Sequence, residues 1–453
     1  MARSGGTKIP EYTLGTPAVR ALRGEIVHFL ADPADCGAAA LAHFADGLLI
    51  IRDGRVADCG PAEQLLGQLP ADCTVDDQRG HLIMPGFVDT HVHYAQTDII
   101  ASDGEQLLAW LEKYTFPAER RFADPAHAAE VAAFFCDQLL RNGTTTAMSF
   151  ATVHAQSVDA LFAAAQARRM RMIAGKVLMD RNCPDFLRDD AHSAETDSRA
   201  LIARWHGRDR LAYAVTPRFA PTSSSAQMAL AGRLYAEHPG VYLQSHVAEN
   251  RAEVAWVAEL YPQARSYLDV YDHYGQLGPR SIYAHCIWLD DSDRARMAAT
   301  GAAMSFCPTS NLFLGSGLFD LERAHALGVR VGLGTDVGAG TSFSMLTTLN
   351  EAYKVLQLQG QKLSAARAFY LATLGGARSL YLDEHIGSFA PGREADLIII
   401  DPAATALLAR RSAAAQTLAE RLFALMMLGD ERCIAETRIL GETAFRRPVE
   451  RGA

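Results

Sequence analysis

Short apolar runs alternate with longer Ala-rich stretches through the middle of the chain, which is the pattern of β/α units around a parallel sheet. Two of the longer stretches, Pro125–Asn142 and Val158–Arg169, are expected to be helices. Eight such units predict an α/β fold, a (β/α)8 TIM barrel with its active site at the C-terminal ends of the strands. The eight predicted strands are Leu82–Asp89, Thr144–Phe150, Met172–Met179, Leu211–Thr216, Val241–Ser245, Ser281–His285, Ala302–Phe306 and Val331–Thr335.

The two ends of the chain have a different pattern. Phe44–Val56 is typical of short strands separated by two Asp-Gly turns, and Ile386–Asp401 has the same β-rich character. The final stretch, Thr405–Ala453, combines a helix around Leu418–Leu428 with a last strand. We therefore expect residues 1–81 and 387–453 to form one small β-sandwich module, and residues 82–386 to form the barrel.

Composition narrows the class of protein. The net charge of −9 over 453 residues argues against a nucleic-acid partner, because binding by counterion release needs clustered Lys and Arg. The polar start, Met1–Pro17, lacks the apolar core of a signal peptide, and no run approaches the ~18 apolar residues that span a bilayer. The eight cysteines contain no CxxC pair and are expected to be reduced thiols. These features favour a cytoplasmic enzyme without a membrane partner.

Histidines and carboxylates stand at the ends of four predicted strands. In an extended strand alternate residues share a face, so His91 and His93 can bind one ion together. A single histidine after an apolar strand is more often a packed or hydrogen-bonded residue, but four such strand ends together predict a metal site. Imidazole and carboxylate ligands suit zinc or iron. The strand ends are Asp89-Thr-His91-Val-His93, Ser245-His246-Val-Ala-Glu249, Tyr283-Ala-His285 and Gly334-Thr-Asp336.

Glu249 is a candidate acid–base residue because it follows His246 by three positions. If the chain turns helical there, the two side chains project to the same side. The alternative interpretation is an ordinary solvated helix glutamate. Asp336 is a candidate both for touching the metal and for accepting a proton from the attacking water.

The motifs Pro85-Gly-Phe-Val-Asp-Thr-His-Val-His93 and Gly334-Thr-Asp336, with His246 and His285, resemble the amidohydrolase superfamily over nearly the whole chain. The resemblance to its mononuclear deaminase branch implies one Zn2+ per chain, with Fe2+ as the alternative, and a homodimer. It also implies that His285 hydrogen-bonds the metal-bound water and that Glu249 shuttles protons. The implied metal ligands are His91, His93, His246 and Asp336.

The resemblance also implies how many metal ions are bound, through the presence or absence of one lysine. Binuclear members of the superfamily bridge two metals with a carboxylated lysine at the end of strand four. The fourth predicted strand runs into Val215-Thr-Pro-Arg218 and contains no lysine, and Lys176 lies within the third, where a structural or substrate-side role is expected. One catalytic metal ion is therefore the prediction.

Longer stretches are similar to the guanine-deaminating members of the superfamily, which implies hydrolysis of guanine to xanthine and ammonia in purine catabolism. Gln96 can donate to and accept from a purine edge, whereas Arg218 supplies only donors and suits O6 or N7. The similar stretches are His93-Tyr-Ala-Gln96, Gly104-Glu-Gln-Leu-Leu108, Thr115-Phe-Pro117, Thr216-Pro-Arg-Phe219, Gln244-Ser-His-Val-Ala-Glu-Asn250, Cys307-Pro-Thr-Ser-Asn311 and Gly334–Leu346.

Phe219 could stack on the purine ring, and His246 and Asp336 are expected to contact the substrate as well. Adenine would present an amino donor to Arg218 where guanine presents O6, and a buried arginine would then lose its partner. The alternative interpretations are loop surface for Gln96, core packing for Phe219 and a surface ion pair for Arg218.

Two other functions stay open at this point. The first is another amino-heterocycle deaminase of the same branch, acting on a pterin, a triazine or an adenosine-type substrate. The second is an inactive scaffold on the same barrel, although such a protein would be expected to have lost metal ligands that are all present here. The HxE and PCxxC signature of the cytidine-type zinc deaminases does not occur, because the chain has no CxxC.

Overall fold

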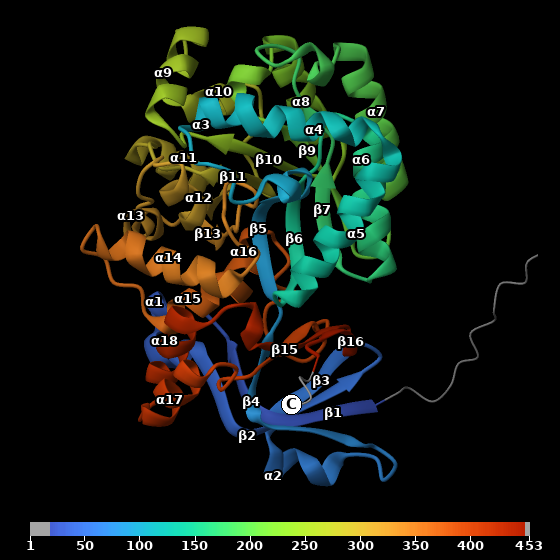
Figure 1. Ribbon diagram of the computed structural model, residues 1–453, viewed down its shortest axis with the longest axis vertical. Helices are drawn as coiled ribbons and strands as arrows, with labels where there is room; N and C mark the ends of the chain where they lie inside the picture. The colour runs from blue at the N-terminus through green and yellow to red at the C-terminus, as the bar shows by residue number, and fades with distance from the viewer. Residues whose placement is uncertain (1–18, 449–453) are drawn as a thin grey trace, which may run out of the picture.

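The computed structural model describes residues 19–448 and has two parts, a barrel and a separate sheet built from both ends of the chain (Figure 1). The polar start, Met1–Pro17, lies outside the described residues. Between residues 19 and 448 no helix is both long enough and apolar enough to cross a membrane. All eight cysteines are free thiols, as expected.

Eight parallel strands form the predicted barrel, in the order β5-β6-β7-β9-β10-β11-β12-β13, and the short strand β8 (Val177–Leu178) pairs with β9. The first and last strands meet, because the Asp336 N–H donates to the His91 carbonyl (3.0 Å) and the His93 N–H donates to the Val337 carbonyl (2.8 Å). The strands are β5 (Phe87–His93), β6 (Thr144–Phe150), β7 (Arg171–Gly175), β9 (Leu211–Pro217), β10 (Tyr242–Val247), β11 (Ser281–His285), β12 (Ala303–Phe306) and β13 (Arg330–Leu333).

Helices cover the outside of the barrel. In α5 (Pro125–Arg141), buried residues such as Val131, Phe135 and Leu139 recur at helical spacing and pack on the strands. The predicted helix Val158–Arg169 is α6 (Ala155–Ala167), which begins earlier than predicted, directly after its N-cap residue His154. The other helices around the barrel are α7 (Ala191–Trp205), α8 (Ser225–Glu237), α9 (Arg251–Leu260), α10 (Tyr267–His273), α11 (Asp291–Thr300), α12 (Pro308–Phe313), α13 (Leu321–Ala326), α14 (Met345–Gln357), α15 (Ala365–Tyr370) and α16 (Gly376–Ser379).

The interior of the barrel is a packed core. Side chains from seven strands meet there and contact Ala377 and Leu380, from α16 and its C-cap. The barrel is therefore filled below its C-terminal end and leaves space for a site only at that end. The strand residues of this core are Val88, Met148, Ile173, Ala214, Tyr242, Ile282 and Ala303.

The chain ends form one continuous sheet of seven strands, where the sequence predicts a small β-sandwich. Its order is β16-β15-β14-β4-β1-β2-β3. Asp53 and Gly54, both with positive φ (52° and 76°), form the predicted turn between β2 and β3. The strands are β1 (Val19–Phe29), β2 (Leu41–Arg52), β3 (Arg55–Pro61), β4 (Val75–Pro85), β14 (Leu397–Ile400), β15 (Ile434–Ile439) and β16 (Glu442–Arg446).

Asp46-Gly47, the other predicted turn, lies inside β2. Gly47 pairs with Gly24 of β1, and a Cβ at Gly47 would lie 2.8 Å from Ile26 Cδ1. Close packing rather than a turn therefore requires this glycine. Near the C-terminus, α18 (Leu418–Leu428) has the predicted bounds, but α17 (Ala406–Ala414) precedes it and two strands follow it instead of one.

The predicted strand Leu82–Asp89 is wrong, because it joins two strands of different sheets. β4 ends at Pro85 in the terminal sheet and β5 begins at Phe87 in the barrel, so the predicted boundary between residues 81 and 82 falls inside β4. The break is at Gly86, where a Cβ would overlap the Thr145 side chain. Both strands are apolar and buried at the junction, so the sequence shows one continuous run. The division into two domains stays a prediction.

Candidate active site

Four side chains that the sequence predicts as metal ligands meet at the C-terminal end of the barrel. His93 Nε2 lies 3.2 Å from His91 Nε2 and 3.1 Å from His246 Nε2. Asp336 Oδ1 lies 3.2 Å from His91 Nε2 and 3.4 Å from His93 Nε2. His91 and His93 share one face of β5, His246 comes from β10, and Asp336 follows β13. The structure thus brings together the whole predicted ligand set.

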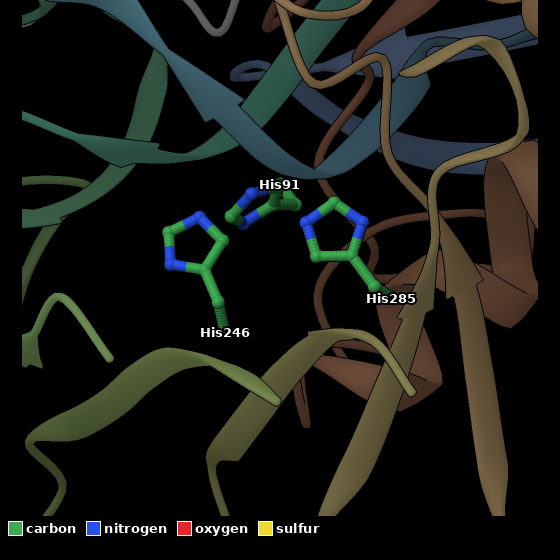
Figure 2. Close-up of side chains that lie close together, drawn as sticks. All are labelled: His91, His246 and His285. Carbon is green, nitrogen blue, oxygen red and sulfur yellow. The ribbon is translucent and has the colours of Figure 1, made fainter. Parts of the chain in front are cut away.

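His285 and Glu249 lie beside this cluster. His285 Nε2 is 3.3 Å from Glu249 Oε2 and 3.8 Å from Asp336 Oδ2. His285 Nδ1 is 2.9 Å from Asn311 Oδ1, and Ser316 Oγ donates to Glu249 Oε1 (3.0 Å). Figure 2 shows the imidazoles of His91, His246 and His285 around one space between the strand ends.

The donor chemistry of this cluster fits a divalent cation. His246 Nδ1 lies 2.6 Å from the Arg218 carbonyl, which only accepts, so Nδ1 carries the proton and the Nε2 lone pair faces His93. Burial lowers the pKa of His91 and lowers that of His93 well below its ordinary value, which keeps both rings neutral. Neutral imidazoles that converge on a carboxylate are a zinc or iron donor set.

The backbone at three positions of the site is left-handed. Ala248 (φ 50°), His285 (φ 71°) and Asp336 (φ 52°) adopt a conformation that costs about 1–3 kcal/mol per residue outside glycine. The predicted helical turn from His246 to Glu249 is therefore wrong, since α9 begins only at Arg251. Ala248 reverses the chain instead, and Glu249 faces the cluster from the loop.

The two carboxylates of the site differ in their proton affinity. Burial raises the pKa of Glu249 to about 7, and the attraction of His285 offsets this only in part. Burial also acts on Asp336, but attraction to His91 and His285 outweighs it and lowers the pKa of Asp336 to about 2. Carboxylates whose pKa values are pushed apart are suited to different tasks, Glu249 to donating a proton near neutral pH and Asp336 to starting the reaction as an anion.

The predicted substrate residues line the same cavity as the cluster. Gln96 Oε1 accepts from the Gly338 N–H (3.3 Å), which leaves its Nε2 donor for the cavity. Arg218 is not in a surface ion pair: its Nη1 donates to both carboxylate oxygens of buried Glu119, at 2.8 Å each. Phe219 is buried against Trp256, with ring centroids 6.2 Å apart.

Sequence reasoning missed one wall of the cavity and the partner of Arg218. The α3–α4 segment comprises α3 (Leu107–Trp110), the π-helical turn η4 (Leu111–Thr115) and α4 (Phe116–Arg120), and it lies across the end of the barrel away from the terminal sheet (Figure 1). Leu107, Trp110 and Leu111 from this segment line the cavity. The sequence does carry a signal for this wall: these three apolar residues have helical spacing in a stretch outside the β/α alternation. No local signal points to Glu119.

Lys176, for which a structural or substrate-side role was expected, follows β7, is buried and forms an ion pair with Asp189. It is not among the residues that line the cavity, which favours the structural role of the two. β9 ends at Pro217 and is followed by Arg218, so the end of the fourth barrel strand offers no lysine.

Comparison with known proteins shows which family and which solved structures this chain is similar to. A profile of the Amidohydrolase family matches residues 82–443. Guanine deaminase from Escherichia coli (strain K12) is 53% identical over 436 residues, which cover 96% of this chain and 99% of that protein. The E. coli guanine deaminase structure superposes with a TM-score of 0.93 over 95% of this chain and all of that one.

Two further solved structures have a fold similar to that of this chain. Guanine deaminase from Bradyrhizobium japonicum superposes with a TM-score of 0.91 at 37% identity, over 95% of this chain and 100% of that chain. Guanine deaminase from C. acetobutylicum, solved with guanine bound in its active site, has a TM-score of 0.85 at 28% identity, over 94% of this chain and 100% of that chain.

Proposed function

The chain belongs to the amidohydrolase family, and on that premise we propose that it catalyses the hydrolytic deamination of guanine to xanthine and ammonia. It is a hydrolase of carbon–nitrogen bonds. The observation that carries the proposal is the likeness to guanine deaminases over nearly the full length of both chains. The cavity agrees with this proposal, since three of the four predicted metal ligands, Glu249 and the predicted purine-binding residues all line it.

We propose that one zinc ion per chain is held by His91, His93, His246 and Asp336, with Fe2+ as the alternative that this donor set admits. When bound, the ion supplies a water molecule whose pKa falls from about 15.7 toward ~7, which makes a nucleophile at neutral pH. The absence of a lysine at the end of β9 supports a single ion.

In this proposal two side chains move the protons and a third orients the water. Asp336, anionic because of its low pKa, accepts a proton from the attacking water. Glu249, whose pKa is raised to about 7, exchanges a proton near neutral pH and in its protonated form donates that proton to the ring nitrogen beside the attacked carbon. The resulting carboxylate takes the proton of the newly added hydroxyl and passes it to the departing amino group, so the carbon–nitrogen bond breaks and ammonia leaves. The proton held by Asp336 then passes to Glu249, which restores both carboxyl groups. His285, between the two carboxylates, orients the water.

Recognition of guanine is assigned to residues on the other side of the cavity. Both hydrogen bonds of Arg218 to Glu119 use Nη1, so the N–H groups on Nη2 and Nε can serve O6 or N7 of the purine. Gln96 presents its amide donor, and Phe219 presents an aromatic face for stacking. His246 and Asp336 contact the substrate at the attacked carbon.

We also propose that the enzyme works in the cytoplasm as a homodimer, without a nucleic-acid or membrane partner. Support for the compartment comes from eight free cysteines, and support against nucleic acid comes from the net charge of −9. Light scattering on the purified protein measures the oligomeric state directly, and a monomer at micromolar concentration would contradict the proposed dimer.

The decisive experiment follows the loss of guanine absorbance with and without added zinc, beside a panel of adenosine, pterin and triazine substrates. Guanine turnover that depends on the metal is the expected result. Turnover of another amino-heterocycle without guanine turnover would overturn the substrate. A metal-free protein that stays inactive after zinc is added would point to the scaffold instead.

A further inference from the structure

The indole of Trp110 is a buried hydrogen-bond donor that lacks an acceptor within residues 19–448. Its side chain is among the largest fully buried ones, and Nε1 has no hydrogen-bond partner. Two other tryptophans show the usual arrangement, since Trp205 Nε1 donates to Asp159 Oδ1 (2.6 Å) and Trp288 Nε1 donates to the Ser316 carbonyl (3.1 Å). Buried indole N–H groups normally find a partner, so the exception at Trp110 needs a reason.

The position of Trp110 supplies that reason. It lines the cavity together with Gln96, Arg218 and Glu249, and Leu107 and Leu111 of the same segment line the cavity too. Since the described residues give Nε1 no acceptor, a molecule bound in the cavity beside Trp110 is the candidate to supply one. Purine bases carry such acceptors on the ring nitrogens and, in guanine, on O6.

The segment that carries Trp110 is tied down at both ends. Gln106, directly before α3, accepts from Asn250 Nδ2 (3.0 Å), next to Glu249 in the chain. Glu119, in α4, holds Arg218. The segment that carries the indole is thus tied to the neighbour of the side chain proposed to move protons and to the side chain proposed to bind the purine edge, so the ring has a defined position in the wall of the cavity.

We propose that Trp110 is a substrate-recognition residue whose Nε1–H donates a hydrogen bond to an acceptor of the purine base. This inference rests on the proposed guanine deaminase function and adds a residue to its recognition site. The indole face also forms part of the apolar wall, so removing the ring and removing the N–H have separable effects.

The test is Trp110→Phe, which keeps an aromatic wall and removes the donor. An acceptor left unpaired in a buried site is expected to raise KM for guanine, and the inhibition constant of xanthine, about tenfold to a hundredfold. The kcat is expected to stay within about threefold, because the bond is made in both ground and transition states. Trp205→Phe removes a donor far from the cavity and serves as the matched control. Melting temperature and zinc content verify that both variants are folded and loaded.

Guanine analogues that each lack or weaken one acceptor locate the bond: 3-deazaguanine, 7-deazaguanine and 6-thioguanine as inhibitors. The effect of Trp110→Phe is expected to vanish for one of them. An equal effect on all ligands, or no effect on guanine, would overturn the hydrogen bond. Wild-type protein that does not turn over guanine would instead contradict the proposed function, so the two failures are distinguishable.

Discussion

Glu119 and Arg218, 99 positions apart in the chain, form a buried ion pair, and its arginine lines the candidate active-site cavity. Both carboxylate oxygens of Glu119 lie 2.8 Å from Arg218 Nη1, and the two side chains are 0% and 3% exposed. A guanidinium buried in this way needs a counter-charge, because the loss of one partner leaves an uncompensated charge in the interior. Glu119 therefore holds Arg218 ready for a substrate that is itself uncharged.

Glu119→Gln is expected to weaken guanine binding and to destabilise the fold. Removing one partner of a buried ion pair typically costs about 3–5 kcal/mol, and the glutamine amide recovers part of this. We expect the free energy of unfolding to fall by about 2–4 kcal/mol and kcat/KM for guanine to fall at least about tenfold, mostly through KM. Glu112→Gln, in exposed η4, is the matched control. Wild-type KM in a folded Glu119→Gln enzyme would contradict the positioning role.

Glu249→Gln is expected to keep the metal and to lose most turnover. Glutamine occupies the same space but cannot exchange a proton, and acid–base catalysis is often worth ~10²–10⁴ in rate. Steady-state kcat together with metal analysis checks this prediction. Glu259→Gln, exposed in α9, should leave kcat unchanged. A Glu249→Gln enzyme with the wild-type rate would remove this residue from the mechanism.

Removal of the metal is expected to abolish activity and to lower the melting temperature. Without a cation, the Nε2 atoms of His93 and its two histidine neighbours, 3.1–3.2 Å apart, face one another beside a carboxylate. A metal ion that binds only the folded state also stabilises that state by mass action. Chelation followed by addition of zinc, with turnover and calorimetry at each stage, tests this. His93→Asn should lose metal, whereas His192→Asn on the exposed surface of α7 should not. Full activity in a protein shown to be metal-free would contradict it.

His28 is expected to make the protein sensitive to acid. It is buried between Phe44 and Phe389, and burial lowers its pKa from 6.5 to about 4. Between pH 6.5 and 4 the unfolded chain binds a proton that the folded chain does not, so stability falls as the pH falls through that window. From pH 7 to pH 5 this group alone contributes a loss of about 2 kcal/mol.

The measurement for His28 is the urea midpoint at pH 7 and at pH 5. His28→Leu should reduce the difference in unfolding free energy between the two pH values by about 2 kcal/mol. His273→Gln, at an exposed position, should leave that difference unchanged. An identical pH dependence in wild type and His28→Leu would contradict the prediction, because it would show that the pKa of His28 is the same in the folded and the unfolded chain.

Much of the barrel could be predicted from the sequence, because its strands are fully buried and read as apolar runs. Six of the eight predicted strands agree with the structure to within two residues at each end, and α18 has the predicted bounds. The errors arose where the local pattern carries no information. The apolar run through Leu82–Asp89 hides the passage from β4 to β5, and the glycine of Asp46-Gly47 serves close packing of β1 on β2.

The cluster of predicted metal ligands was determined by the sequence alone, since alternation along β5 puts His91 and His93 on one face and the parallel strands bring His246 and Asp336 to the same end. Only the tertiary structure decided how Glu249 faces that cluster, that Glu119 partners Arg218, and that Trp110 lines the cavity with an Nε1–H that has no acceptor among residues 19–448. The physical reason is the range of the forces involved. Strand alternation and apolar periodicity act between near neighbours in the chain, whereas a buried charge or donor takes its partner from whatever the fold brings within hydrogen-bonding distance.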